Sequence, residues 1–382
     1  MLKKLFIFCG LFSLALSGFA SPRAETSPPP EPAPASRPAA DSAQSTGPHN
    51  AITDVAGVLV GSYQRNHTGT TVIIFSTGGV GGVDVRGSSP GTRETDLLRP
   101  TDQVDNVNAI VLSGGSAYGL AAADGVMLWL EERGMGWPVG GGNVVPIVPS
   151  AILFDPGRFD RPFNERPTAE FGRRAADAAA AGPVAMGNVG AGAGAVAGGL
   201  KGGLGTASVD LGNGVIVGAL VAINSAGSTV HRATGEFYGA YLEIGDEFGG
   251  LGAPFAGAGG APFELAGAEP VKNTTIAVVA TNIELTKAQA QKIAQMAHDG
   301  FARAMSPAHT MYDGDTIFAV GTGEITQARL SRTQGWEYMN NNVNKVGAAA
   351  ADCIVRAIIH AMLNAQTVGT VQSYLDAYPG AR

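Results

Sequence analysis

Apolar and polar positions follow one another along the chain in the patterns of a mixed α and β protein. Five short runs of β-branched and apolar residues, each bounded by glycine or polar residues, predict strands. They lie at 70–75, 109–112, 215–223, 274–281 and 316–320. Apolar residues recur at three- and four-residue spacing in 118–133, 286–305 and 346–364, which predicts three helices. This succession of strands and helices favours an α/β or α+β enzyme.

Composition supports the same interpretation and argues against a fibre or a disordered protein. The 382 residues are 45% hydrophobic and only 15% charged, and 55 of them are glycine. So many glycines indicate tight turns and close backbone approaches around apolar strands. The net charge is -7 and neither sign forms a long run, so no surface that follows phosphates is indicated. We therefore expect no nucleic-acid partner.

The beginning of the chain predicts an export signal followed by a spacer. Residues 1–20 combine a positively charged start, an apolar stretch at 5–16 and a small-x-small cleavage site. A retained membrane anchor is the alternative, but the apolar stretch is short for a bilayer. Residues 21–49 are rich in proline, alanine and serine, which predicts a disordered linker, and folding is expected to begin near Asn50. The expectation is a bacterial periplasmic or secreted protein without membrane contact once the signal is removed.

No cofactor or metal is indicated by the residue patterns. The six histidines, at 49, 67, 231, 298, 309 and 360, never fall at the three- to five-residue spacing of a zinc motif. The glycine run at 190–205 lacks the strand, turn and helix that a dinucleotide site needs. Cys353 lies in the middle of a predicted helix, which favours a core thiol over a nucleophile. Because Cys9 lies within the signal, the mature chain has no intramolecular disulfide.

Asn273 and Thr274 stand where a glycine-rich loop at 248–270 gives way to a predicted strand. A hydroxyl at a strand entry can attack the preceding carbonyl and leave a chain that begins with threonine. The freed α-amine, with a pKa of about 7.7–8.0, can then serve as the base for its own hydroxyl. The same threonine also satisfies β-propensity without any chemistry, so the residues alone leave both interpretations open.

Asp313 and Asp315 flank Gly314 at a turn that leads into the strand at 316–320. Adjacent carboxylates raise each other's pKa and can share a proton, which suits the orientation of a nucleophile and proton transfer. A solvated Asp-Gly turn is the alternative, because both residue types favour turns.

Taken together, these segments resemble the D-aminopeptidase/β-peptidyl aminopeptidase family, which includes the nylon-oligomer endohydrolase. The resemblance rests on 273–282, on 313–320, and on the motifs at 112–119 and 201–207, and it extends over about 52–363. It implies a four-layer αββα sandwich of the N-terminal-nucleophile-hydrolase type. It also implies that the precursor is cut into an α chain, 50–273 within the hydrolase domain, and a β chain, 274–382. The two chains are expected to stay associated, in a homo-oligomer.

The resemblance also implies roles for individual residues. Thr274 matches the nucleophile and Asn273 the residue before the scissile bond, as in the nylon-oligomer type. Asp313 and Asp315 match that type's Asp-x-Asp pair. Lys201 matches a lysine of the site, and Asn224 matches the asparagine expected in the oxyanion hole, where its amide would donate to developing negative charge. Phe154, a candidate pocket residue, stands where the nylon-oligomer enzyme has a tyrosine.

These observations predict an autoprocessed amidohydrolase that removes N-terminal residues from short peptides or amino-acid amides. The first alternative is endo-hydrolysis of nylon-type ω-amino-acid oligomers, which Asn273-Thr274 and Asp313-x-Asp315 favour and Phe154 disfavours. The second is a non-enzymatic periplasmic binding protein on the same fold with an uncut chain.

Overall fold

The strand that contains the first predicted run is longer than expected and continues from one layer of a single nine-stranded sheet into the other. In the computed structural model, which describes residues 44–231, 234–249, 251 and 273–381, this strand is β2 (Thr68–Val85). Its first half pairs with β1 (Val58–Arg65) and β4 (Asn106–Ser113), whereas its last residues pair with β13 (Thr316–Ile325). The pairing with β4 slips in register between Ile74 and Gly79, where β2 passes from one layer to the other.

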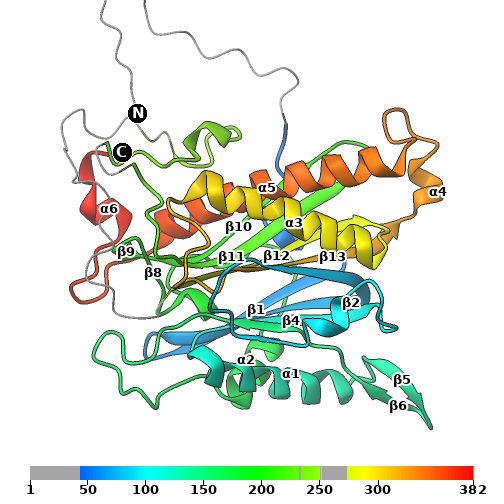
Figure 1. The fold of residues 1–382 in the computed structure, drawn as a ribbon, viewed down its shortest axis with the longest axis horizontal. Helices are drawn as coiled ribbons and strands as arrows, with labels where there is room; N and C mark the ends of the chain where they lie inside the picture. The colour runs from blue at the N-terminus through cyan, green and yellow to red at the C-terminus, as the bar shows by residue number, and fades with distance from the viewer. Residues whose placement is uncertain (1–43, 232–233, 250, 252–272, 382) are drawn as a thin grey trace, which may run out of the picture. The chain divides into compact units, whose positions relative to one another are not determined.

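The strands form two facing layers enclosed by two layers of helices (Figure 1). One layer has the order β10–β11–β12–β13, in which only β12 and β13 run parallel. Its strands besides β13 are β10 (Gly203–Asp210), β11 (Ile216–Asn224) and β12 (Thr274–Ile283). The other layer contains β1, the first half of β2, β4, β7 (Ser150–Ile152) and β3 (Thr92–Arg93).

Helices cover the outer face of each sheet. The first sheet lies under α3 (Lys287–Ala304) and α5 (Met339–Asn364), and the second lies against α1 (Ala122–Glu131) and α2 (Ala169–Asp177). The predicted four-layer αββα sandwich is therefore confirmed. The remaining short elements are β5 (Trp137–Gly140), β6 (Asn143–Val145), β8 (Val196–Ala197), β9 (Leu200–Lys201), α4 (Gln327–Leu330), α6 (Tyr374–Ala377) and six 3-10 turns in the described residues.

Three apolar cores follow from these layers. One lies between α3 and α5 and their sheet, one between the two sheets, and one under α1 and α2. Alternate residues of a strand supply different cores: Val279 faces the helices, whereas Val278 and Phe318 pack between the sheets. A strand buried on both faces reads as a continuous apolar run, which is why β12 is so clear in the sequence.

The central helix α5 explains two features of the sequence. By length and composition it could span a membrane, but 89% of its most apolar window is buried within the protein, as in a core helix. Cys353 lies in this buried part, and burial raises the pKa of its thiol to about 12, which fits the predicted core role. α5 begins earlier than predicted because an asparagine-rich stretch hides the apolar periodicity around Val343.

Strand β10 was not predicted, since glycines interrupt its apolar run. A Cβ on Gly205 would lie 2.0 Å from the carbonyl oxygen of Ala357 on α5. Glycine at this position therefore lets the helix approach the sheet closely.

Contacts of the described chain begin slightly before Asn50. Ser45 forms an isolated bridge with Asp210, and the backbone N–H of Gly47 donates to Ser208 Oγ at 3.0 Å. The end of the predicted linker is thus attached to β10. The predicted signal, and most of the glycine-rich loop at 248–270, lie outside the described residues.

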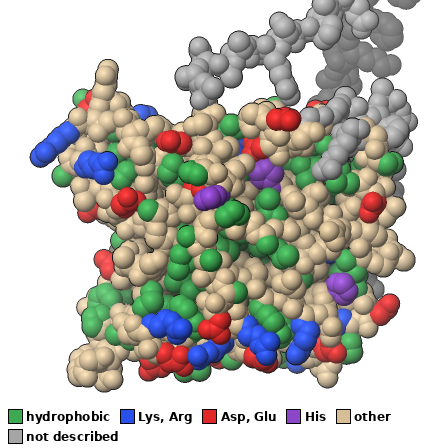
Figure 2. Space-filling view, turned by 180° about the vertical axis from the view of Figure 1, so that it is seen from behind, with side chains coloured by type: hydrophobic (Ala, Val, Ile, Leu, Met, Phe, Trp, Pro, Cys, Tyr) green, Lys and Arg blue, Asp and Glu red, His purple; other side chains and the backbone are tan. Residues whose placement is uncertain are grey.

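Charged side chains of both signs alternate along the outer edge of the α1 and α2 layer (Figure 2). Several form ion pairs, such as Arg173 with Glu132 and Arg174 with Glu170. Such exposed pairs contribute little stability.

A buried polar cluster joins the two segments that the expected cut would separate. Arg356 on α5 donates to both carboxylate oxygens of Glu247, at 2.6 and 2.7 Å, and also to Asn50 Oδ1 at 2.8 Å. His360 Nε2 lies 3.3 Å from the same carboxylate. Burial alone raises the pKa of Glu247, but hydrogen bonds from His360 and Arg356 outweigh it and hold the pKa at about 2, below its ordinary value of 4.5.

We expect the Glu247→Gln variant to be less stable at neutral pH by about 3–5 kcal/mol, since breaking a buried pair leaves a charge uncompensated. A carboxyl with a lowered pKa contributes stability above its ordinary pKa and loses that contribution as pH falls toward its folded pKa. The stability difference between wild type and variant should therefore shrink as pH falls from 4.5 toward about 2. Urea unfolding across this pH range measures the difference.

Glu170→Gln is the matched control, because Glu170 and its partner Arg174 are each 54% exposed. We expect this variant to lose less than about 1 kcal/mol. An equal loss in both variants would mean that the buried cluster contributes no special stability.

Candidate active site

Thr274 is the first residue of β12, and its hydroxyl lies against the peptide bond that precedes it. Its side chain is almost fully buried, and Oγ1 donates to the carbonyl oxygen of Asn273. The backbone N–H of Gly314 donates to the same Oγ1 at 3.2 Å. The hydroxyl of Thr274 is therefore positioned between the Asn273–Thr274 peptide group and an N–H donor from a second strand entry.

Asn224 is brought to Thr274 by the antiparallel pairing of β11 and β12. It is the last residue of β11 and faces Thr274 directly in the register. Directly opposed residues place their side chains on the same face of a sheet, with Cβ atoms about 4.5–5.5 Å apart. The buried amide of Asn224 accepts through Oδ1 from Val196 N–H at 3.0 Å and from Arg158 Nη1, and its Nδ2 donates to the carbonyl oxygen of Phe154 at 3.4 Å.

The two predicted aspartates lie at the same sheet edge as Thr274 because β13 runs parallel to β12. Residues that precede two adjacent parallel strands lie at the same edge of the sheet, and here Ile276 is paired with Thr316. Asp315 Oδ1 accepts from the N–H of Thr275 at 2.8 Å, and Oδ2 accepts from the N–H of His309 at 3.1 Å. Asp315 thereby holds the backbone of Thr275, the residue that follows Thr274, in place.

Asp313 is held on the other side of the turn. Its Oδ1 accepts from Ala226 N–H at 3.1 Å, and its Oδ2 accepts from the N–H of Thr310 at 3.1 Å and from the Thr310 hydroxyl. Burial, together with the charge of Asp315, raises the pKa of Asp313. In the described structure each carboxylate thus accepts hydrogen bonds from the protein, and the turn between them presents the N–H of Gly314 to Thr274.

Gly314 is required at this turn by the lack of space for a side chain. A Cβ there would lie 2.9 Å from Thr274 Oγ1 and 2.5 Å from the carbonyl oxygen of Ser89. The Asp-Gly-Asp motif therefore joins two anchoring carboxylates to a backbone donor that approaches the hydroxyl closely.

Lys201 is fully buried in a charged cluster with Arg158 and Asp155. Its Nζ donates to the carbonyl oxygens of Gly192 at 3.1 Å and Gly202 at 2.7 Å. Burial, followed by the positive charge of Arg158, lowers the pKa of Lys201 to about 7. Among the described residues, no hydrogen bond joins Lys201 to Thr274, and the charged neighbours of Lys201 are Arg158 and Asp155.

Sequence reasoning missed two side chains of this site. Arg158 contacts Asn224, and His309 Nδ1 lies 2.8 Å from Asp315 Oδ2. Both lie in irregular loop segments, where no periodic pattern identifies them. The available signals were a charged turn directly after Phe154 and a histidine shortly before the Asp-Gly-Asp motif.

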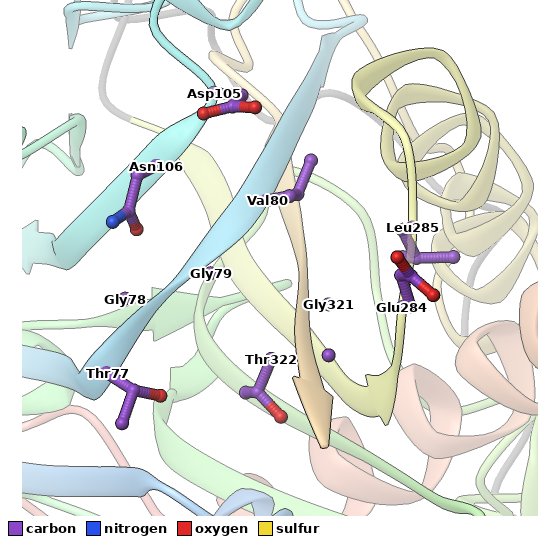
Figure 3. A pocket seen from close by; sticks show the side chains of 11 residues that line it. Thr77, Gly78, Gly79, Val80, Asp105, Asn106, Glu284, Leu285, Gly321 and Thr322 are labelled. Carbon is purple, nitrogen blue, oxygen red and sulfur yellow. The ribbon is translucent and has the colours of Figure 1, made fainter. Parts of the chain in front are cut away.

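A separate cavity of about 240 Å³ lies at the opposite end of β12 (Figure 3). It is lined by β2 residues Gly78 and Gly79, by Asn106, and by Glu284, which follows the end of β12. Glu284 directly follows the ten-residue strand that begins at Thr274, so the two residues are ten steps apart, or roughly 33 Å at about 3.3 Å per residue. This cavity is therefore not part of the Thr274 site.

Comparison with known sequences gives the family. The profile of peptidase family S58 matches residues 50–374. An uncharacterized aminopeptidase of Mycobacterium leprae is 47% identical over 358 residues, which cover 87% of this chain and 96% of that protein. A 6-aminohexanoate-oligomer endohydrolase of Kocuria sp. is 31% identical over 344 residues, which cover 83% of this chain and 87% of that protein.

Comparison with solved structures gives the fold. The β-aminopeptidase of a Burkholderia species matches with a TM-score of 0.64 at 24% identity, covering 88% of this chain and 96% of that one. The L-aminopeptidase D-Ala-esterase/amidase of Ochrobactrum anthropi, described as a variant of the Ntn hydrolase fold, matches with a TM-score of 0.64 at 23% identity and the same coverage. The sequence matches argue against the non-enzymatic alternative. The chain therefore belongs to peptidase family S58 and is a hydrolase that acts on peptide bonds.

Proposed function

We propose that this protein is an exported amidohydrolase that cuts itself between Asn273 and Thr274 and then uses Thr274 as its nucleophile. The observation that carries the proposal is the contact of Thr274 Oγ1 with the Asn273 carbonyl, with the Gly314 N–H at the same hydroxyl. The chemistry open to a hydroxyl in this place is addition to the adjacent carbonyl carbon.

In the maturation step, Thr274 Oγ1 adds to the carbonyl carbon of Asn273. The C–N bond breaks as the hydroxyl proton passes to the departing nitrogen, which leaves Asn273 joined to Thr274 as an ester. Water then hydrolyses the ester, giving a carboxylate at Asn273 and a free α-amine at Thr274.

In the catalytic step, that α-amine accepts the proton of its own hydroxyl while Oγ1 adds to the substrate amide carbon. Its ordinary pKa of about 7.7–8.0 leaves part of it unprotonated near neutral pH. The proton passes to the leaving amine, and water hydrolyses the resulting acyl ester. The Asn224 amide stabilises the negative charge that develops on the carbonyl oxygen.

The preferred substrates are short peptides or amino-acid amides from which one N-terminal residue is released. The name of the Mycobacterium leprae relative supports this class. Endo-hydrolysis of ω-amino-acid oligomers is the second candidate, favoured by the Kocuria relative and by the Asn273-Thr274 and Asp313-x-Asp315 residues. A panel of α-, β- and D-amino-acid amides together with 6-aminohexanoate oligomers separates the two, because the first releases free amino acids and the second releases internal fragments.

We expect the purified active protein to consist of two chains, 21–273 and 274–382, after removal of a signal at 1–20. The mixture should give a new N-terminus at Thr274 on sequencing, and the intact masses of both chains by mass spectrometry. Recovery of both chains from the periplasm or medium tests export as well. A single unbroken chain in fully active enzyme would contradict self-cleavage.

A further inference from the structure

Two donors, the Arg158 guanidinium and the Val196 N–H, hold the Asn224 amide in one orientation. A guanidinium has only donors, so the atom of Asn224 that faces it must be the oxygen. The backbone N–H of Val196 also donates to this oxygen, at 3.0 Å. With Oδ1 held by two donors, a rotation of the amide by half a turn would place Nδ2 against an N–H and a guanidinium, which is unfavourable.

Arg158 is itself fixed in a buried position. It follows β7 in a loop, and its Nη1 donates to the carbonyl oxygen of Gly194 at 3.0 Å as well as to Asn224. Burial lowers the pKa of Arg158 to about 10, while the charge of Asp155 opposes this change. Asp155 is in turn held by the N–H of Gly115 at 2.8 Å and by Arg161 at 3.0 Å.

Burial of a second arginine in this cluster costs free energy, because its charge is removed from water. Hydrogen bonds or charge pairing that a neutral residue could not provide must compensate this cost. Arg161 already pairs with Asp155, so Arg158 is not needed to neutralise that carboxylate. Besides its hydrogen bond to the Gly194 carbonyl oxygen, Arg158 supplies a donor to Asn224, the residue paired with Thr274 at the start of β12.

We propose that Arg158 is a positioning residue that holds the Oδ1 of Asn224, so that Nδ2, which donates to the Phe154 carbonyl oxygen at 3.4 Å in this structure, serves as the donor at the Thr274 site when substrate is bound. This inference rests on the proposed function, in which the Asn224 amide donates to the oxyanion. Arg158 acts through Asn224 and does not itself contact the reacting atoms.

The test uses the full chain and measures turnover per mole of cleaved enzyme, so that slower maturation is not mistaken for slower catalysis. We expect Arg158→Met to lower kcat by about 10²-fold, the usual cost of losing one oxyanion donor, with KM changed little. Arg158→Lys keeps one donor and should recover part of this loss. Arg166→Met is the matched control, because Arg166 lies in the same loop but stacks on Tyr118, and it should retain kcat within about twofold.

A double-mutant cycle decides whether Arg158 acts through Asn224. Once Asn224→Ala has removed the amide, adding Arg158→Met should lower kcat by less than about threefold further, since residues of one unit are not additive. Multiplication of the two single effects would overturn the proposal, as would wild-type kcat in folded Arg158→Met or in Asn224→Ala. If Arg158→Met does not fold, Arg158→Lys in both backgrounds gives the same cycle with a smaller effect. Failure of the proposed function would give a different result: the wild type would remain uncut, or Thr274→Ala would keep its activity. Neither outcome depends on Arg158.

Discussion

Thr274→Ala should leave a single uncut chain that hydrolyses no amide. The substitution removes the oxygen that contacts the Asn273 carbonyl, so neither the acyl shift nor the acyl-enzyme can form. We expect turnover to fall by at least about 10⁴-fold, the scale seen when a nucleophile is removed. Because the strand register does not depend on the hydroxyl, stability should fall by only about 1 kcal/mol. Intact-mass analysis and an amide hydrolysis assay check both parts.

Two variants sharpen this expectation. Thr274→Ser keeps the oxygen and loses only a methyl group, so it should retain some cleavage and activity. Thr275→Ala is the matched control: the neighbouring hydroxyl lies 3.8 Å from Met305 Sδ, away from the scissile carbonyl, and its loss should leave cleavage intact. If uncut Thr274→Ala hydrolysed amides as fast as wild type, another nucleophile would be required. Ser116, whose backbone has a φ of 55°, would be the first residue to examine.

The sequence predicted the elements with strong periodicity and failed where glycine or asparagine obscured it. Strand β12 and helix α3 are predicted with nearly correct ends, and in the structure the Thr286 hydroxyl caps α3 by accepting from the N–H of Gln289. Strand β10 was missed because Gly205 serves the packing of α5 and not the apolar pattern. The continuation of β2 into the second layer depends on tertiary packing, so the strand propensity of its residues does not predict it.

The residues of the candidate active site also fall into those that the sequence predicts and those that only the fold brings together. The Asn273-Thr274 pair and the Asp-Gly-Asp turn lie next to strong strands, so their sequence positions were informative. Their meeting depends on the parallel pairing of β12 with β13, which residue patterns alone do not specify. The contact of Arg158 with Asn224 joins residues far apart in sequence through irregular loops, and only the fold reveals it.

The position of β12 also determines whether the two chains stay together after a cut. β12 pairs with β11, which would belong to the first chain, along its whole register from Thr274 to Thr281. α5, from the second chain, packs on β10 and β11 and pairs with Glu247 through Arg356. Hydrogen bonds, apolar core and a buried ion pair thus cross the boundary, so cleavage of one peptide bond should not separate the chains.

The two segments should therefore form active enzyme when they are produced as separate chains, 21–273 and 274–382, with the initiator methionine removed from the second. The reason is that catalysis needs only the free amine and hydroxyl of Thr274 in the assembled fold, and no self-cleavage step. We expect turnover within about tenfold of the naturally processed protein, given that assembly from two chains is concentration-dependent. Amide hydrolysis by the co-purified pair measures it.

Two altered forms of the second chain show which group of Thr274 is needed. With Thr274→Ala, the pair should assemble and remain inactive, because the nucleophile is missing. With the initiator methionine retained, the hydroxyl is present but the α-amine is tied in a peptide bond, so this pair should also be inactive. Full activity of the methionine-retaining pair would mean that the amine is not the base. Lys201, whose pKa burial and Arg158 lower to about 7, would then be the group to substitute next, since a neutral amine near pH 7 can accept the proton in its place.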